Sequence, residues 1–242
     1  MQMRQLFDKE SSTYSYLLWD KQTLDAVIID PVLEQVERDI RLIEELGLNL
    51  RYSLETHIHA DHITGAAQLR DRFDCHVAVH ENARAACADV WLKQGDHILF
   101  GDNVLKVLHT PGHTATDICY LAADRVFTGD TLLVRGSGRT DFQSGDAGQA
   151  YDSVIDKLFV LPDKIRVYPA HDYNGMTTST IGEEKRLNPR LGGNQTREGY
   201  IRIMEGMKLE KPQKIDVAVA GNQRCGISAS EGLVNQAGST LD

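Results

Sequence analysis

Several strand-like segments of this chain are each followed within five residues by a histidine or an aspartate, and the densest example is THIHADH at residues 56–62. Three histidines and one aspartate fall within this run, directly after an apolar segment. Alternate side chains of an extended segment point to one side, so His57 and His59 should face the same way. We expect Asp61 and His62 to open the helix that follows. A junction between a strand and a helix is where an α/β sheet commonly places its site.

Three further strand-like segments end in the same way. Turns that contain Pro and Gly can present a side chain at the end of a strand. Any one of these pieces is commonplace, but four strand ends that each carry a possible ligand are hard to attribute to chance. Imidazole and carboxylate groups without thiolates suit Zn, Fe or Mn. The three segments and the possible ligands that follow them are Val104–Leu108 with His113, Val126–Phe127 with Asp130, and Ile165–Tyr168 with His171.

Strand-like and helix-like segments alternate along the 242 residues, which favours an α/β fold. Around Ile98–Phe127 strands follow one another without a helix between them, so we expect mixed sheets. The length suits a single domain over 1–242, with a polar segment from about residue 181 and a flexible tail at 227–242. The other expected strands are Ala26–Ile29, Val77–Val79 and Ile118–Leu121, and the expected helices are Leu33–Leu46, Ala60–Phe73 and Ala147–Leu158.

Composition and charge narrow the possible partners. Hydrophobic residues make up 41% of the chain and charged residues 25%, as in globular proteins. Because no apolar run reaches about 18 residues, we predict no membrane span. The first twenty residues lack the pattern of a signal or transit peptide, so we expect a cytoplasmic protein. The net charge of −9 argues against nucleic acid as a partner.

The cysteines do not suggest a disulfide framework. The chain has four of them and no CxxC pair, which is few for its length. We therefore expect reduced thiols, mostly packed as small hydrophobic side chains. Cys225 lies close to the expected flexible tail and could be exposed. The other three are Cys75, Cys87 and Cys119.

Together, THIHADH, TPGHT at 110–114 and the other strand ends resemble the motifs of the metallo-β-lactamase superfamily. The resemblance implies an αββα sandwich, in which two mixed β-sheets lie face to face with helices outside and the site at one edge. The runs RGSGRTDFQ at 135–143 and PAHDYNG at 169–175 resemble, more specifically, the persulfide dioxygenases. That resemblance implies oxidation of glutathione persulfide by O₂ to sulfite and glutathione, at one mononuclear non-haem Fe(II) per chain.

Iron oxygenases of this kind use two histidines and one carboxylate and keep open positions on the metal. His57, His113 and Asp130 supply such a set, and similarity to the family selects the same three. Four more residues could complete a second metal site, as in the zinc hydrolases. The resemblance implies that in the dioxygenases this second site stays empty, and that the four, with Asp172, orient the ligands. The residues alone do not decide whether the site binds one metal ion or two. These four are His59, Asp61, His62 and His171.

Binding of glutathione calls for groups that recognise its two carboxylates, and arginine can hold a carboxylate with two hydrogen bonds. Arg139 and Tyr173 are the first candidates, and Arg190 is the third. Arg139 could equally form a structural salt bridge with Asp141 or Asp172. Tyr173 could simply pack at a turn with its hydroxyl in water, and Arg190 could be an ordinary solvated charge. We expect Asp141 to orient neighbours near the site.

Two other functions stay open at this point. One is a binuclear zinc thioesterase of the glyoxalase II type, a hydroxyacylglutathione hydrolase, which would attack a glutathione thioester with a metal-bound hydroxide. The other is a sensor that binds a persulfide and signals through a partner, suggested by the polar, arginine-containing C-terminal segment. A sensor would not need the full ligand set. A homodimer is expected only on the grounds of the family.

Overall fold

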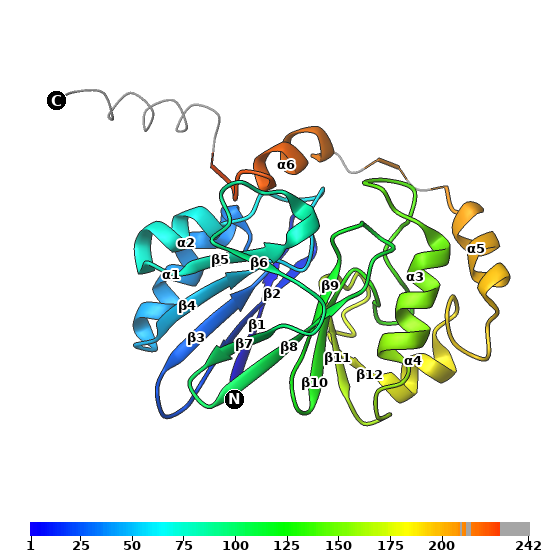
Figure 1. Cartoon of the computed structure of the whole chain (residues 1–242), viewed down its shortest axis with the longest axis horizontal. Helices are drawn as coiled ribbons and strands as arrows, with labels where there is room; N and C mark the ends of the chain where they lie inside the picture. Colours follow the sequence, from blue (N-terminus) through cyan, green and yellow to red (C-terminus); the bar gives the residue numbers. More distant parts are fainter. Residues whose placement is uncertain (209, 212–213, 228–242) are drawn as a thin grey trace.

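Two six-stranded sheets face each other in the computed structural model, which describes residues 1–208, 210–211 and 214–227 (Figure 1). Each sheet mixes parallel and antiparallel neighbours. The first sheet is ordered β1 (Gln2–Asp8), β2 (Thr13–Trp19), β3 (Asp25–Ile29), β4 (Asn49–Leu54), β5 (His76–His80) and β6 (Val90–Leu92). The second is ordered β12 (Ser179–Thr180), β11 (Arg166–Pro169), β10 (Arg125–Gly129), β9 (Ile118–Leu121), β8 (Asn103–His109) and β7 (His97–Phe100).

Helices cover the outer face of each sheet (Figure 1). A short 3₁₀ turn leads into the first helix, and the third continues as a π-helical turn over Val154–Leu158. On the first sheet lie α1 (Val36–Glu45) and α2 (Ala66–Phe73), and on the second lie α3 (Ala147–Ser153), α4 (Ile181–Leu187) and α5 (Arg197–Glu205). The last described helix, α6 (Ile215–Asn222), lies at the upper edge of the first sheet in Figure 1. The expected αββα sandwich is confirmed.

Strand β2 shows how the layers are held together. Its sequence TYSYLLW is buried throughout, because both of its faces are covered. Tyr16 and Leu18 point into the core between the two sheets, whereas Leu17 and Trp19 point into the core beneath α1. A third apolar core joins the second sheet to α3 and α5. One strand thus serves two cores, which fixes its register.

The local elements largely follow the sequence predictions, with one clear error. The strand expected at Ile118–Leu121 is found with those bounds, but the helix expected from Ala60 begins only at Ala66. Asp61 and His62 therefore lie in a loop before the helix. The physical reason is that the carbonyls of the preceding loop accept hydrogen bonds from a distant asparagine side chain and not from helical amides. Strands β1, β2, β6 and β12 were not predicted.

The prediction of four reduced cysteines is wrong for two of them. Cys87 and Cys225 form a disulfide that spans 138 residues of sequence, and Cys225 is only 1% exposed. Helix α6 brings Cys225 against the loop before β6, which contains Cys87. No local sequence pattern predicts this contact. Cys75 and Cys119 are free and buried, as expected. The described part of the chain contains no helix with both the length and the apolar character needed to cross a bilayer. The tail expected at 227–242 lies outside the described residues, apart from its first residue.

Candidate metal centre

The strand ends singled out in the sequence meet at one edge of the sandwich. His57 follows β4 of the first sheet, while His113, Asp130 and His171 follow β8, β10 and β11 of the second. Donor atoms of His57, His113 and Asp130 all lie within 4.8 Å of one another. The rings of His57 and His113 stand perpendicular, at 89° and 4.9 Å between centroids. The two sheets thus converge on a cluster whose size suits a single metal ion.

Both imidazoles of this cluster are held in place by a hydrogen bond at Nδ1, the ring nitrogen that faces away from the cluster. His113 donates from Nδ1 to the carbonyl oxygen of Arg139 at 2.7 Å. His57 contacts the Thr56 hydroxyl through Nδ1 at 3.0 Å, and that hydroxyl donates to Asp30. A proton fixed on Nδ1 leaves the Nε2 lone pair of a neutral imidazole available for a metal. The arrangement therefore presents two ready nitrogen ligands beside the Asp130 carboxylate.

A second group of possible ligands adjoins the first. Donor atoms of His59, Asp61 and His62 also lie within 4.8 Å of one another. His171 stands between the two groups, with Nε2 at 3.5 Å from Asp61 Oδ2 and 3.6 Å from Asp130 Oδ1. Its Nδ1 donates to the carbonyl of Ser12 at 3.1 Å. The structure therefore brings together all seven histidine and aspartate side chains that the strand ends predicted to lie around the metal, and leaves the number of metals open.

Three buried polar atoms support a cation at this place. Among the described residues, His59 Nδ1, His62 Nε2 and Asp130 Oδ1 have no hydrogen-bond partner. The opposite nitrogens are occupied, since His59 Nε2 contacts Asp30 at 3.1 Å and His62 Nδ1 contacts Asp61 at 3.0 Å. An unsatisfied buried polar atom is costly, and bound metal would satisfy such atoms. Asp130 belongs to the first cluster, whereas His59 and His62 belong to the second. The residues present thus fit a metal bound by nitrogen and oxygen.

The pKa shifts of the histidines in the cluster also favour a bound cation. Burial lowers the pKa of His57 far below its usual value, so this imidazole is neutral and able to bind a metal. Burial alone would also lower the pKa of His59, but the Asp30 carboxylate beside it holds that pKa well above the usual value. The pKa of His171 is raised too, because Asp130 and Asp61 outweigh its burial. Negative charge is in excess here, as a cation site requires.

Two acidic residues that support the cluster were missed in the sequence. Asp30 follows β3 and accepts hydrogen bonds from the Thr56 amide at 2.7 Å and the Thr56 hydroxyl at 2.8 Å, besides holding His59. Glu55 lies 3.5 Å from His59 Nε2, and burial raises the pKa of its carboxyl. A donor atom from each of Asp30, Glu55 and His59 lies within 4.8 Å of the others. Asp30 carries the same signal of an acidic residue at a strand end, and applying that rule to β3 would have found it.

A cavity of about 560 Å³ opens onto the candidate metal centre. His113, Asp130 and His171 lie on its wall, and the loop 133–139 and the C-terminal Met207 and Glu210 close its sides. Its volume is in the range of cavities that hold small molecules. The residues of the C-terminal segment that border it include Arg190.

The three residues predicted to contact the substrate all border this cavity, but they differ in their exposure and in the partners of their side chains. Arg139 holds Asp141 with two hydrogen bonds of 2.7 and 2.8 Å, so the salt bridge considered in the sequence is present. Arg190 is half-buried, and burial lowers its pKa; one of its amino groups donates to Ser137 O at 2.6 Å. Tyr173 is 72% exposed and stacks on His171, at 5.9 Å between ring centroids.

Asp172 also borders the cavity, but its carboxylate faces the backbone. It accepts hydrogen bonds from the amides of Asn174 at 2.9 Å and Thr177 at 2.6 Å. Asp172 thus shapes the loop that carries Tyr173, and it makes no hydrogen bond to a predicted ligand.

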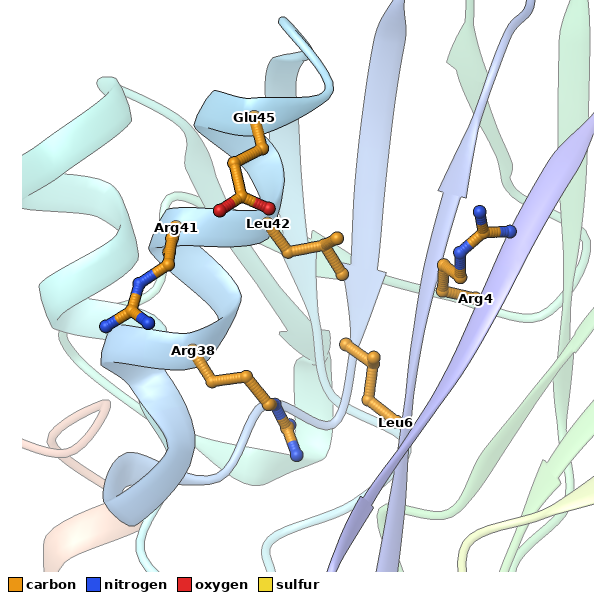
Figure 2. A pocket seen from close by; sticks show the side chains of 6 residues that line it. All are labelled: Arg4, Leu6, Arg38, Arg41, Leu42 and Glu45. Atoms are coloured by element: carbon orange, nitrogen blue, oxygen red, sulfur yellow. The ribbon is translucent and has the colours of Figure 1, made fainter.

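A separate hollow of about 510 Å³ lies between β1 and α1 (Figure 2). Leu6 and Leu42 face each other across it, while Arg4 and Arg41 lie on opposite sides. Arg38 is engaged by Asp39 and by the carbonyl of Phe7. Because its cationic groups do not converge on one point, the hollow does not form a second binding centre.

The fold and the strand-end cluster place the chain in a class of metal-binding αββα proteins, and the model of the metallo-β-lactamase superfamily matches residues 8–171. A mouse (Mus musculus) protein named persulfide dioxygenase ETHE1, mitochondrial, is 48% identical over 93% of this chain and 89% of its own length. The crystal structure of ETHE1 from Myxococcus xanthus is 54% identical, with a TM-score of 0.92 over 94% of this chain and 100% of that one. The chain belongs to the persulfide dioxygenase family of the metallo-β-lactamase superfamily.

Hydroxyacylglutathione hydrolase GloC of Haemophilus influenzae is more distant. It is 37% identical over 72% of this chain and 91% of its own length.

Proposed function

We propose that this protein is a glutathione-dependent persulfide dioxygenase. It would convert glutathione persulfide, O₂ and water to glutathione and sulfite, a reaction in which the outer sulfur is oxidised and O₂ is reduced. One observation carries the proposal: the chain is 48% identical, over 93% of its length, to a protein named persulfide dioxygenase. The cavity beside the histidine cluster offers a place for such a substrate.

We further propose one Fe(II) per chain, held by His57, His113 and Asp130. Two neutral imidazoles and one carboxylate are the set that non-haem iron oxygenases use. When bound, Fe(II) supplies the one-electron chemistry that the reaction of a closed-shell persulfide with triplet O₂ needs. The protein's own part is to hold the ligand atoms in place: Arg139 O orients His113, and Thr56 with Asp30 orients His57.

The remaining polar groups would act around that centre. His171 reaches Asp130 and Asp61 at once, so it would fix the orientation of the ligand carboxylate. His59, Asp61 and His62 would support the neighbouring loop, and Asp172 would hold the backbone that carries Tyr173. The histidines and Asp61 would thereby restrict the ligands to one geometry, which is how such surroundings raise metal affinity.

For the glutathione moiety, Arg190 is the best-placed cation. Its side chain borders the cavity, and one amino group donates to Ser137 O, while its other N–H groups have no partner among the described residues. Arg139 is already paired with Asp141, so a substrate carboxylate would have to share or displace that partner. Tyr173, stacked on His171 at the cavity, would add an apolar surface and a hydroxyl. Arginine is the residue suited to hold a carboxylate with two hydrogen bonds.

The test is the metal content of protein purified without added metal, together with an oxygen-electrode trace when glutathione persulfide is added. About one iron per chain with O₂ consumed and sulfite formed is the expected result. Bound zinc and a flat trace would refute the dioxygenase proposal.

A second candidate, the glyoxalase II type of thioesterase, is favoured by one specific observation. His59, Asp61 and His62 cluster beside the first three ligands, and two of their nitrogens are buried without a partner among the described residues. A binuclear zinc centre would use them to activate water. Two zinc ions per chain and rapid hydrolysis of S-lactoylglutathione would establish this alternative.

The compartment and the assembly are also proposals. We expect the cytoplasm, although the mouse relative is named a mitochondrial protein. We expect a homodimer, which light scattering of the purified protein would test. Fractionation of the source cells would decide the compartment.

A further inference from the structure

Helix α6 meets the loop that carries four of the metal-centre residues, although about 160 residues separate them in sequence. The contact is made by Asn222, the last residue of the helix, whose side chain is buried. Figure 1 shows α6 at the edge of the first sheet, apart from the other helices. Neither the proposed chemistry nor the strand-end motifs explain why this helix should be there.

The Asn222 amide satisfies three backbone groups of that loop. Its Nδ2 donates to the carbonyls of His59 at 2.9 Å and His62 at 2.8 Å, and its Oδ1 accepts from the Thr64 amide at 2.8 Å. These groups would otherwise be buried without partners, or would continue a regular helix. A single side chain therefore sets the path of the loop between His59 and Thr64.

A covalent bond holds α6 in this position. Three residues after Asn222, Cys225 forms a disulfide with Cys87, which lies between β5 and β6. The carbonyl of Cys225 also accepts a hydrogen bond from the Ala67 amide at 3.0 Å, at the start of α2. Cys87 is half-buried, whereas Cys225 is buried. The segment 222–225 is thus tied both to the metal-centre loop and to a neighbouring loop of the first sheet.

We propose that α6 is a redox-locked clasp: Asn222 positions the loop 57–64 for metal binding, and the Cys87–Cys225 disulfide keeps the clasp closed. Asn222 is a positioning residue, because it acts through the backbone of His59 and His62 and not on the metal. This inference rests on the proposed metal centre, but not on the reaction proposed for it.

A low-molecular-weight thiol can reduce the Cys87–Cys225 disulfide. A thiolate RS⁻ would attack Cys87 Sγ, the more accessible sulfur, to form a mixed disulfide and release Cys225 as a thiolate, which takes up the proton. A second RSH would then release Cys87 as a thiol. The balance is one protein disulfide plus two RSH giving two cysteine thiols and RSSR. Reduction would free α6 and loosen the loop, so the metal would dissociate faster.

The experiment compares wild type, Asn222→Ala, Cys87→Ser and the double variant, all as full-length protein. The first readout is the rate at which a chelator removes the bound metal. The second is the visible spectrum of the Co(II)-substituted protein, which reports the geometry of the ligands. Asn103→Ala is the matched control, since Asn103 is a hydrogen-bonded asparagine that contacts Asp20 and belongs to no metal cluster.

Asn222→Ala should speed metal release about 10- to 100-fold and change the Co(II) spectrum. Cys87→Ser should act in the same direction and should increase amide exchange in α6. If both changes open one clasp, the double variant should be no faster than Asn222→Ala alone. Asn103→Ala should lower the melting temperature without changing either metal readout.

Three outcomes would overturn the proposal. A fall in melting temperature for Asn222→Ala with unchanged metal release and spectrum would make Asn222 merely structural. Additive effects of the two substitutions would show that the disulfide and Asn222 act separately. A wild-type protein that binds neither iron nor Co(II) would refute the metal centre itself. Should Asn222→Ala not fold, Asn222→Asp keeps the shape and the acceptor while removing both donated hydrogen bonds, and it carries the same expectation.

Discussion

Gly138 lies directly against Asp130: its amide donates to the Asp130 carbonyl at 2.6 Å, and a Cβ on Gly138 would lie 2.6 Å from that same oxygen. The added atom would also lie 2.9 Å from Cγ of His113. Two proposed ligands therefore leave no room for a side chain at this position. The run 135–143, which distinguishes this family by resemblance, is therefore in contact with the proposed ligands Asp130 and His113.

Gly138→Ala should consequently lose bound metal. The methyl group must displace either the backbone of Asp130 or the ring of His113, and displaced ligands bind metal about 10- to 100-fold more weakly. Metal content measured after gel filtration checks this. Gly136→Ala is the matched control, because its Cβ would meet nothing closer than 3.7 Å and metal content should be unchanged. Equal metal content in the two variants would contradict the argument.

Asp130→Ala should abolish iron retention. The substitution removes the only carboxylate of the proposed ligand set and leaves two neutral imidazoles, which hold Fe(II) poorly. Iron per chain in the purified variant is the measurement. Asp124→Ala, at an exposed pair with Arg125, should keep its iron. Normal iron in Asp130→Ala would mean that the three ligands are misassigned.

Removing Arg139 or Arg190 should separate substrate binding from metal binding. His113 is oriented by the backbone carbonyl of Arg139, so Arg139→Ala keeps that hydrogen bond and should keep iron. Losing a charge-assisted hydrogen bond to a carboxylate costs about 1.5–3 kcal/mol, so KM for glutathione persulfide should rise about tenfold or more. We expect the larger rise for Arg190→Ala.

Steady-state kinetics with iron-loaded protein checks both variants. Arg197→Ala is the comparison, because Arg197 pairs with Asp152 on the surface and does not border the cavity. An unchanged KM for Arg190→Ala would remove Arg190 from the substrate site. An unchanged KM for Arg139→Ala would leave it the structural role of holding Asp141 and the Glu210 carbonyl.

The strand ends could be predicted because each one carries its signal locally. A short apolar run followed by a histidine or an aspartate identified His57, His113, Asp130 and His171, and the sandwich brings them to one edge. The same rule would have found Asp30 after β3. This rule does not determine which ring nitrogen of each histidine faces the metal. That choice depends on the acceptor that holds the other nitrogen of the ring.

Other features depend on where a distant part of the chain returns. Asn222 is an ordinary residue in the apolar stretch IDVAVAGN, and only its docking gives it three backbone partners. The disulfide joins residues 138 apart, so no local spacing reveals it. Strand β2 was missed for a different reason: it is buried on both faces, so it lacks the alternation that marks a half-exposed strand.

The buried carboxyl of Asp39 makes the stability of the protein depend on pH. Asp39 on α1 is fully buried, and burial raises its pKa from 3.8 to about 6 despite the neighbouring Arg38. Because the pKa is higher in the folded state, the folded protein binds more protons between these values. Stability should therefore fall as pH rises from about 4 to about 6, and the loss should be complete above that window.

Asp39→Asn resembles the protonated carboxyl at every pH, so it should escape this loss. The difference in unfolding free energy between the variant and the wild type should grow by about 2.5 kcal/mol from pH 4 to pH 8, in favour of the variant. Urea unfolding at several pH values measures it. Gln68→Ala, at an exposed position on α2 with no titratable side chain, should give a difference that does not change with pH. A difference for Asp39→Asn that stays flat would show that this carboxylate is ionised at no cost, and that Arg38 and the α1 surface compensate its burial in full.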